Sequence, residues 1–218
     1  MTASLLVPAA LAQTPGILDK KLADGGYVDV STLHPGIIVS LMYARDDNFT
    51  GHLLYTPGLM TRAWLHPDAA EALGRAAAIL DSVAPGTRLL VKDAARPMEI
   101  QRRMFASVAG TPKARYVANP GKGGGLHNFG LAVDITLADA EGKELPMGTP
   151  VDHLGTEANI DREPELVARG VISENERQNR LLLRRVMRKA GFSTIRTEWW
   201  HFNLVSLRIA KTKYRLID

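Results

Sequence analysis

The sequence predicts an α+β fold, a single domain in which helices flank a small, mainly antiparallel sheet. The chain has 218 residues, of which 45% are hydrophobic and 23% charged, and this is enough for one sizeable core. Helical patterns are separated along the chain from short pairs of strand-like segments. That separation favours α+β over a doubly wound parallel sheet.

The first half of the chain alternates strand and helix. Residues 37–43 are apolar and β-branched enough for a strand. Pro67 begins a helix that ends before Pro85. Residues 88–92 follow as a buried strand, and residues 98–108 as a moderately amphipathic helix. The inward stripe of the first helix consists of Ala69, Leu73, Ala76, Ala77 and Leu80.

The second half contains three strand-like segments and one long helix. Residues 131–137 are rich in β-branched side chains, and their alternation places Ala132, Asp134 and Thr136 on one face. A capping box over residues 173–176 begins a helix that ends at Gly191. Residues 192–195 and 199–204 predict the last two strands. The inward residues of the helix would be Leu182, Val186 and Met187.

Composition excludes several classes of protein and site. There is no cysteine, so disulfides and thiolate ligands are absent and a transition-metal site must use histidine and carboxylate. The net charge of +4 is scattered, and its densest run, residues 184–189, has the spacing of a solvated helix face. We expect no nucleic-acid partner. No apolar stretch approaches the ~20 residues that a membrane-spanning helix needs.

The N-terminal residues resemble a secretion signal. Residues 1–12 contain a short apolar core followed by an Ala-x-Ala pattern before Gln13, although the usual positive charge is missing. We interpret them as a signal peptide remnant, residues 13–24 as an arm, and residues 25–218 as the catalytic domain. This favours the periplasm or cell envelope; the alternative is an apolar tail on a cytoplasmic protein.

Two motifs bring together the residue types of a zinc site. His127 and Asp134 are separated by Gly130, as in a loop that turns into a strand. Glu198 and His201 lie three residues apart beside two tryptophans. A catalytic zinc typically has three protein ligands, an open fourth position and a nearby base. We expect one zinc per chain on the small sheet, with His127, Asp134 and His201 as ligands and Glu198 as the base.

Arg96 is a second candidate catalytic group. It follows the strand at residues 88–92 and precedes Pro97, which fixes the backbone after it. A guanidinium held in this way can stabilise an oxyanion or clamp a carboxylate. A structural salt bridge at a helix start is an equally good interpretation. In either case Asp93 would orient the side chain.

These motifs resemble the zinc D-alanyl-D-alanine dipeptidases of the vancomycin-resistance type, which belong to the zinc D,D-peptidases. The resemblance is carried by Asp-x-x-Arg-Pro at residues 93–97, His-x-x-Gly-x-Ala-x-Asp at 127–134 and Glu-Trp-Trp-His at 198–201. It extends over residues 25–205 and includes the loop at residues 47–51.

The resemblance implies zinc-dependent hydrolysis of the small dipeptide D-Ala-D-Ala. It implies that Glu198 is the acid-base group and that Arg96 stabilises the transition state. It also implies that Asp152, with Tyr43, receives the free ammonium group of the dipeptide. Gly125 departs from the family, which usually has serine there; since Gly125 offers no hydroxyl, a backbone group or water would replace it.

Two alternatives to the dipeptidase remain open from the sequence. A D,D-carboxypeptidase or endopeptidase would act on longer peptidoglycan stems and needs an open groove. A non-catalytic zinc-dependent binding module would need neither Glu198 nor Arg96, and both are present. The sequence does not indicate an oligomeric state.

Overall fold

A computed structural model describes residues 14–218, so the expected signal segment at residues 1–12 lies outside the described residues. The fold is α+β, and its main sheet has five strands in the order β2-β4-β5-β7-β6. Only β2 and β4 are parallel; the other neighbours pair antiparallel, as expected. The strands are β2 (Ile37–Val39), β4 (Arg88–Asp93), β5 (Ala132–Ala138), β6 (Ser193–Ile195) and β7 (Glu198–Asn203).

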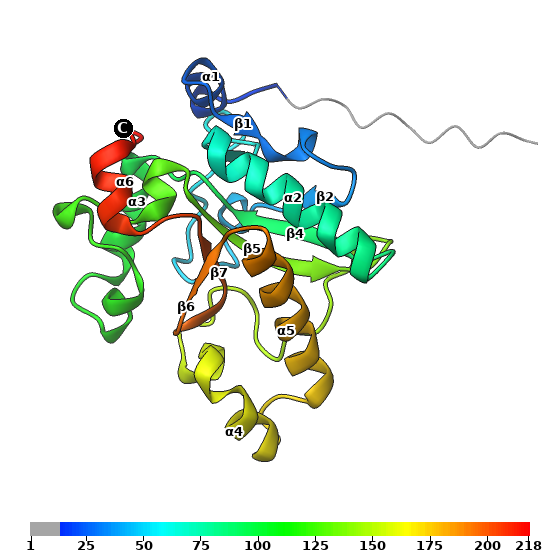
Figure 1. The fold of residues 1–218 in the computed structure, drawn as a ribbon. Coiled ribbons are helices and arrows are strands. Elements are labelled where there is room, and N and C mark those ends of the chain that lie inside the picture. The colour runs from blue at the N-terminus through cyan, green and yellow to red at the C-terminus, as the bar shows by residue number, and fades with distance from the viewer. Residues whose placement is uncertain (1–13) are drawn as a thin grey trace, which may run out of the picture.

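Two helices cover one face of this sheet. They are α2 (Pro67–Val83) and α5 (Glu174–Lys189), which contact each other and lie side by side in Figure 1. The predicted stripe of α2 is buried at all five positions. The capping box of α5 also forms, with Ser173 and Glu176 satisfying each other's backbone amides. One prediction for α5 needs correction: Leu183 is fully buried, whereas Leu182 is only partly buried.

The N-terminal arm is an integral part of the core. It contains α1 (Ile17–Asp24), whose Leu18 and Leu22 are buried, and it packs beside a small antiparallel sheet of β1 (Val28–Asp29) and β3 (Trp64–Leu65). The carboxylate of Asp19 is 1% exposed and ties this arm to the chain before β3. It accepts hydrogen bonds from Gly16 N, Thr61 N, Thr61 Oγ1, Arg62 N and Trp64 Nε1.

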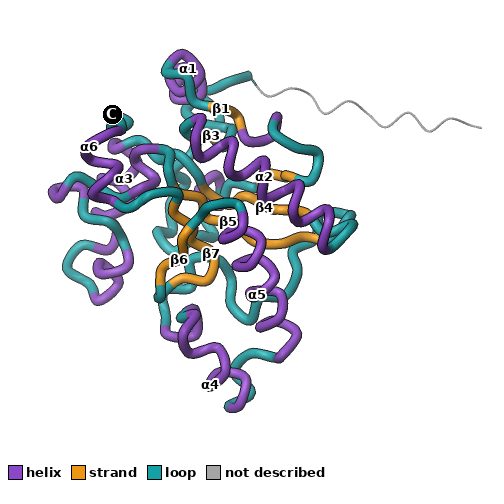
Figure 2. Tube along the Cα trace, viewed as in Figure 1, coloured by secondary structure: helices purple, strands orange, loops and turns teal. Residues whose placement is uncertain are grey.

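The remaining helices lie at the periphery. They are α3 (Met98–Val108), α4 (Glu163–Ala168) and α6 (Leu207–Lys213). Figure 2 shows that much of the chain between β5 and α5 is loop rather than regular structure. Within residues 14–218, no helix combines the length and the apolar character needed to cross a membrane.

Strand β5 lies at the centre of the sheet and is buried along its whole length. Its apolar residues alternate with the small and polar set that includes Asp134, as the sequence predicts. Asp134 is directly opposite His201 of β7 in the register. Side chains opposite each other on adjacent strands project from the same face, so the sheet itself brings these two residues together.

Candidate metal centre and active site

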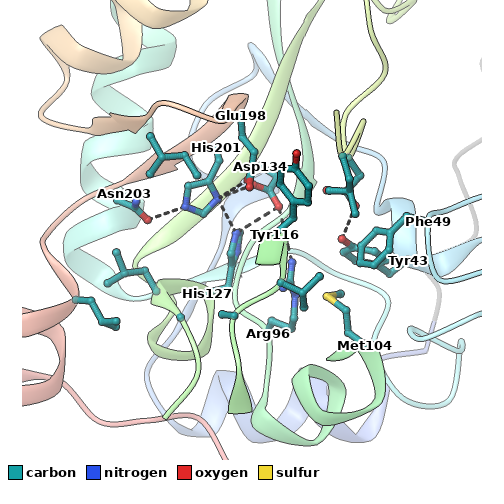
Figure 3. Close-up of a pocket in the computed structure, with 18 residues that line it drawn as sticks. Tyr43, Phe49, Arg96, Met104, Tyr116, His127, Asp134, Glu198, His201 and Asn203 are labelled. Atoms are coloured by element: carbon teal, nitrogen blue, oxygen red, sulfur yellow. Dashed lines mark hydrogen bonds and ion pairs between the residues drawn. The ribbon is translucent and has the colours of Figure 1, made fainter. Parts of the chain in front are cut away.

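A cavity of about 290 Å³ contains nearly all of the predicted site residues. Its wall combines apolar side chains with polar groups, and His127, Asp134, Glu198 and His201 converge on one side of it (Figure 3), an arrangement typical of a small-molecule site. The predicted residues that line it are Tyr43, Arg96, His127, Asp134, Asp152, Glu198 and His201. Asp93, the predicted partner of Arg96, lies behind the cavity wall and is fully buried.

Three separate backbone elements position the predicted metal ligands. Asp134 and His201 face each other across β5 and β7. His127 lies in a 3₁₀ turn, Leu126–Phe129, which ends at Gly130 in the left-handed conformation and leads directly into β5. One ligand atom from each of these three side chains lies within 4.8 Å of the other two.

The hydrogen bonds of the two imidazoles determine which nitrogen faces the centre. His127 Nδ1 lies 2.6 Å from the carbonyl oxygen of Ala94, which can only accept, so Nδ1 donates and Nε2 carries the lone pair. His127 Nε2 faces His201 Nδ1 at 3.2 Å, and His201 Nδ1 faces Asp134 Oδ1 at 2.9 Å.

This convergence of acceptors suits a cation. With the opposite nitrogens protonated, His127 and His201 each present a lone pair to the centre, beside a carboxylate. Such a set is unfavourable when empty and becomes favourable around a divalent metal ion. Burial raises the pKa of Asp134, but the charge and N–H groups of His127 and His201 in their protonated form outweigh it and hold the pKa well below its ordinary value; a bound cation would act in the same direction. The carboxylate is therefore ionised at neutral pH, as a metal ligand must be.

Glu198 begins β7 and points into the same cavity (Figure 3). Its Oε2 lies 4.0 Å from His201 Nδ1, so it borders the metal centre. Burial is the main cause that raises the pKa of Glu198 to about 7, and the nearby carboxylates of Asp134 and Asp152 add to it. A carboxyl group with such a pKa can both take and return a proton at neutral pH.

A chain of buried hydrogen bonds holds Arg96 in place. Its Nε donates to Asp93 Oδ2 at 3.0 Å and its Nη1 to Gln101 Oε1 at 3.1 Å. The other oxygen of Asp93 accepts from the Tyr55 hydroxyl at 2.7 Å. The backbone amide of Arg96 also donates to the carbonyl of His127, which couples the guanidinium to the metal-ligand turn. Arg96 thus makes the predicted salt bridge and still faces the cavity.

Tyr43 and Asp152 form a pair on the opposite side of the cavity. The Tyr43 hydroxyl donates to Asp152 Oδ2. Burial, followed by the charge of Asp134, raises the pKa of Asp152 to about 7. Burial and the charge of Asp152 also raise the pKa of Tyr43 well above its ordinary value, so the phenol stays protonated and acts as the donor. Asp152 adopts a φ of +64°, in the left-handed region.

Three groups at the site were not identified from the sequence: Tyr55, Gln101 and Asn203. Tyr55 and Gln101 support Asp93 and Arg96 from a loop and from α3, and no local pattern marks them. Asn203 contacts His201, and its position in the sequence could have identified it. It lies two positions after His201 in a predicted strand, so the period of two places both on the same face.

Comparisons with known proteins show the family to which the chain belongs. A family model described as D-ala-D-ala dipeptidase matches residues 23–216. The chain is 33% identical to a D-alanyl-D-alanine dipeptidase of Escherichia coli over 177 residues, which cover 81% of this chain and 83% of the relative. It is 31% identical to one from Streptomyces coelicolor, covering 83% and 92%. It is 27% identical to one from Enterococcus faecalis, covering 84% and 93%.

Proposed function

The chain belongs to the D-Ala-D-Ala dipeptidase family and is a metallopeptidase, and we propose that it hydrolyses the dipeptide D-alanyl-D-alanine in a zinc-dependent reaction. The observation that carries this proposal is the convergence of three acceptor groups with Glu198 on one cavity. Binding alone would need the acceptors but not the adjacent carboxyl group. The match to D-alanyl-D-alanine dipeptidases over more than four fifths of the chain supports the same activity.

His127 through Nε2, His201 through Nδ1 and Asp134 would hold the zinc ion. The donor set fits zinc because two neutral imidazoles and one carboxylate are among its preferred ligands. When bound, zinc supplies a Lewis acid that lowers the pKa of water and polarises a carbonyl group. The side of the site that faces the cavity is left free for water and substrate.

Glu198 would act as the general base and then as the general acid. It takes a proton from the attacking water and returns that proton to the leaving amine. From its position beside His201 it would reach that water, and its raised pKa of about 7 suits both transfers.

Arg96 would stabilise the negative charge that develops on the oxygen of the scissile carbonyl. Its guanidinium is preorganised by Asp93 and Gln101, so little rearrangement is needed when the charge forms. Because the group is buried, water screens its charge only weakly.

Asp152, with Tyr43, would bind the ammonium group of the dipeptide. A buried carboxyl with a pKa near 7 is only partly ionised at neutral pH, and an adjacent cation such as a free amino terminus would favour its carboxylate form. Tyr43 fixes one oxygen of Asp152 and leaves the other for the substrate.

Cleavage of longer peptidoglycan stem peptides is a second candidate function because of one observation. Another cavity, of about 560 Å³, borders the first at Phe49, Asp152 and Leu154. A residue preceding the dipeptide would have to pass Asp152 to reach it. If Asp152 binds a free ammonium group, as we propose, that path is closed and the dipeptide is preferred.

The test is a substrate panel with zinc present and with zinc removed by a chelator. The panel contains D,D-, L,D- and L,L-dipeptides and one wall pentapeptide. We expect rapid cleavage of D-Ala-D-Ala that depends on zinc, and loss of activity by about 10²–10⁴-fold in Glu198→Ala with zinc still bound. Efficient pentapeptide cleavage would favour the carboxypeptidase. Full activity of Glu198→Ala would contradict the assignment of the base.

A further inference from the structure

Asn203 lies on the far side of the His201 ring from the other two acceptors. Its Oδ1 is 2.8 Å from His201 Nε2, while His201 Nδ1 faces Asp134 and His127 (Figure 3). The distance is that of a well-formed hydrogen bond. Both nitrogens of this imidazole are therefore engaged, one with an amide and one with the metal centre.

The backbone holds Asn203 rigidly. Residues 201 and 203 project from the same face of β7 because side chains alternate along a strand. Residue 203 is paired on both sides, with Ala132 of β5 and Ser193 of β6. The Ser193 hydroxyl also donates to the backbone carbonyl of Asn203 at 3.0 Å. The amide therefore meets the imidazole from a fixed position.

Asp134 and Asn203 favour opposite tautomers of His201. A neutral imidazole has one donor nitrogen and one acceptor nitrogen. If Nδ1 carried the proton, it would donate to Asp134, and its lone pair would no longer be available to a metal ion. If Nε2 carries the proton, it donates to Asn203 Oδ1, and Nδ1 is free. The Asp134 carboxylate thus favours the tautomer that cannot bind a metal ion through Nδ1. The acceptor of Asn203, on the other side of the ring, favours the tautomer that can.

We propose that Asn203 is a positioning residue that holds His201 in the tautomer whose Nδ1 can bind a metal ion. The inference rests on the metal site of the proposed function and adds a residue to it. Histidine ligands commonly donate their second N–H to a carbonyl or carboxylate, and loss of that partner typically weakens metal affinity by about 10–100-fold. His127 already follows this rule through the carbonyl of Ala94.

Three variants test the proposal through zinc affinity, measured by competition with a chromophoric chelator. Asn203→Leu removes the acceptor at similar size, and we expect about 10–100-fold weaker zinc binding. Asn203→Asp keeps an acceptor, so its affinity should stay at or above that of the wild type. Ser193→Ala is the matched control, because it removes a hydrogen bond to the backbone of residue 203 and leaves the amide side chain intact.

Unchanged affinity in Asn203→Leu would overturn the proposal. Equal losses in Asn203→Leu and Ser193→Ala would also overturn it, since they would mean that the strand edge, and not the amide, matters. If the wild type itself bound no zinc, the proposed function would fail first, so the two failures are distinguishable.

A second measurement does not depend on the folding of any variant. Nitrogen-15 NMR of zinc-loaded wild-type protein reports which nitrogen of His201 carries the proton. We expect the proton on Nε2 in the wild type. A proton on Nδ1 in the wild type would overturn the proposal.

Discussion

The methyl group of Ala118 occupies the space that a side chain at Gly125 would need. A Cβ atom on Gly125 would lie 2.9 Å from Ala118 Cβ, closer than such atoms approach in folded proteins. Both residues line the cavity. The serine that the family resemblance leads us to expect at this position could therefore not be accommodated unless Ala118 moved. The presence of glycine instead of serine at position 125 is thus linked to the presence of Ala118 beside it.

This contact predicts a non-additive pair of substitutions. Gly125→Ala should destabilise the protein by about 1–3 kcal/mol, because overpacking forces the neighbouring backbone to shift. In Gly125→Ala/Ala118→Gly the clash is removed, so most of this loss should be recovered. Urea unfolding of the two single variants and the double variant measures the coupling. Simple addition of the two single effects would mean that the contact carries no strain.

The second prediction concerns the free amino group of the substrate. Asp152→Ala should lower kcat/KM for D-Ala-D-Ala by about 10²-fold or more, since breaking a buried ion pair costs about 3 kcal/mol. The effect on an N-acetylated dipeptide should be much smaller, because that substrate has no ammonium group. Asp47→Ala, at an exposed carboxylate on the rim of the second cavity, is the control and should change neither value. Equal losses on both substrates would indicate that Asp152 only shapes its loop.

The third prediction is that ionisation of Glu198 destabilises the metal-free protein in a pH-dependent way. Burial raises the pKa of Glu198 from 4.5 to about 7, so the folded state holds a proton that the unfolded state has already lost. Stability therefore falls as pH rises from about 4.5 to 7. Glu198→Gln, which cannot ionise, should raise the stability by up to about 3 kcal/mol at pH 8 and by far less at pH 5. Thermal melts at both pH values test it, and an equal difference at the two would contradict it.

The fourth prediction concerns the attachment of the N-terminal arm. Burial alone would raise the pKa of Asp19, but hydrogen bonds from Trp64, Gly16 and Thr61 outweigh it and lower the pKa below its ordinary value of 3.8. Asp19→Asn should destabilise the protein by about 2–3 kcal/mol near neutral pH, because several donors lose a charged acceptor.

The pH dependence of that loss follows from the sign of the shift. A lowered carboxyl pKa stabilises the fold above pH 4, and the contribution disappears as pH falls through the lowered pKa. The wild type and Asp19→Asn should therefore converge in strong acid when unfolding is followed by circular dichroism. Asp24→Asn, at an exposed carboxylate in the same helix, should change the stability little at any pH. Persistence of the full difference in acid would argue against the charge as its origin.

The sequence predicted the elements whose ends carry local signals. Pro67 begins α2, Ser173 caps α5, and α3 spans residues 98–108 as expected. The zinc-ligand candidates were predicted from residue type and spacing, and the sheet register brings two of them, Asp134 and His201, together.

Other features depend on contacts that no local pattern records. Helix α1 is short, and its stability comes from Asp19 and from two leucines that pack against distant residues. Tyr55 reaches Asp93 across the fold. The burial of Leu183 rather than Leu182 depends on the rotation of α5 about its own axis against its neighbours. Such details are fixed by tertiary packing, which overrides local propensity.

The left-handed backbone of Asp152 places stability and function in opposition at one residue. At a φ of +64°, glycine would be the least strained residue, and other residues pay a steric cost that aspartate only partly avoids. A search for thermostable variants would therefore tend to select glycine at position 152 and, with it, the loss of the carboxylate. Persistence of aspartate at this position under such a search would itself report that the activity was being selected.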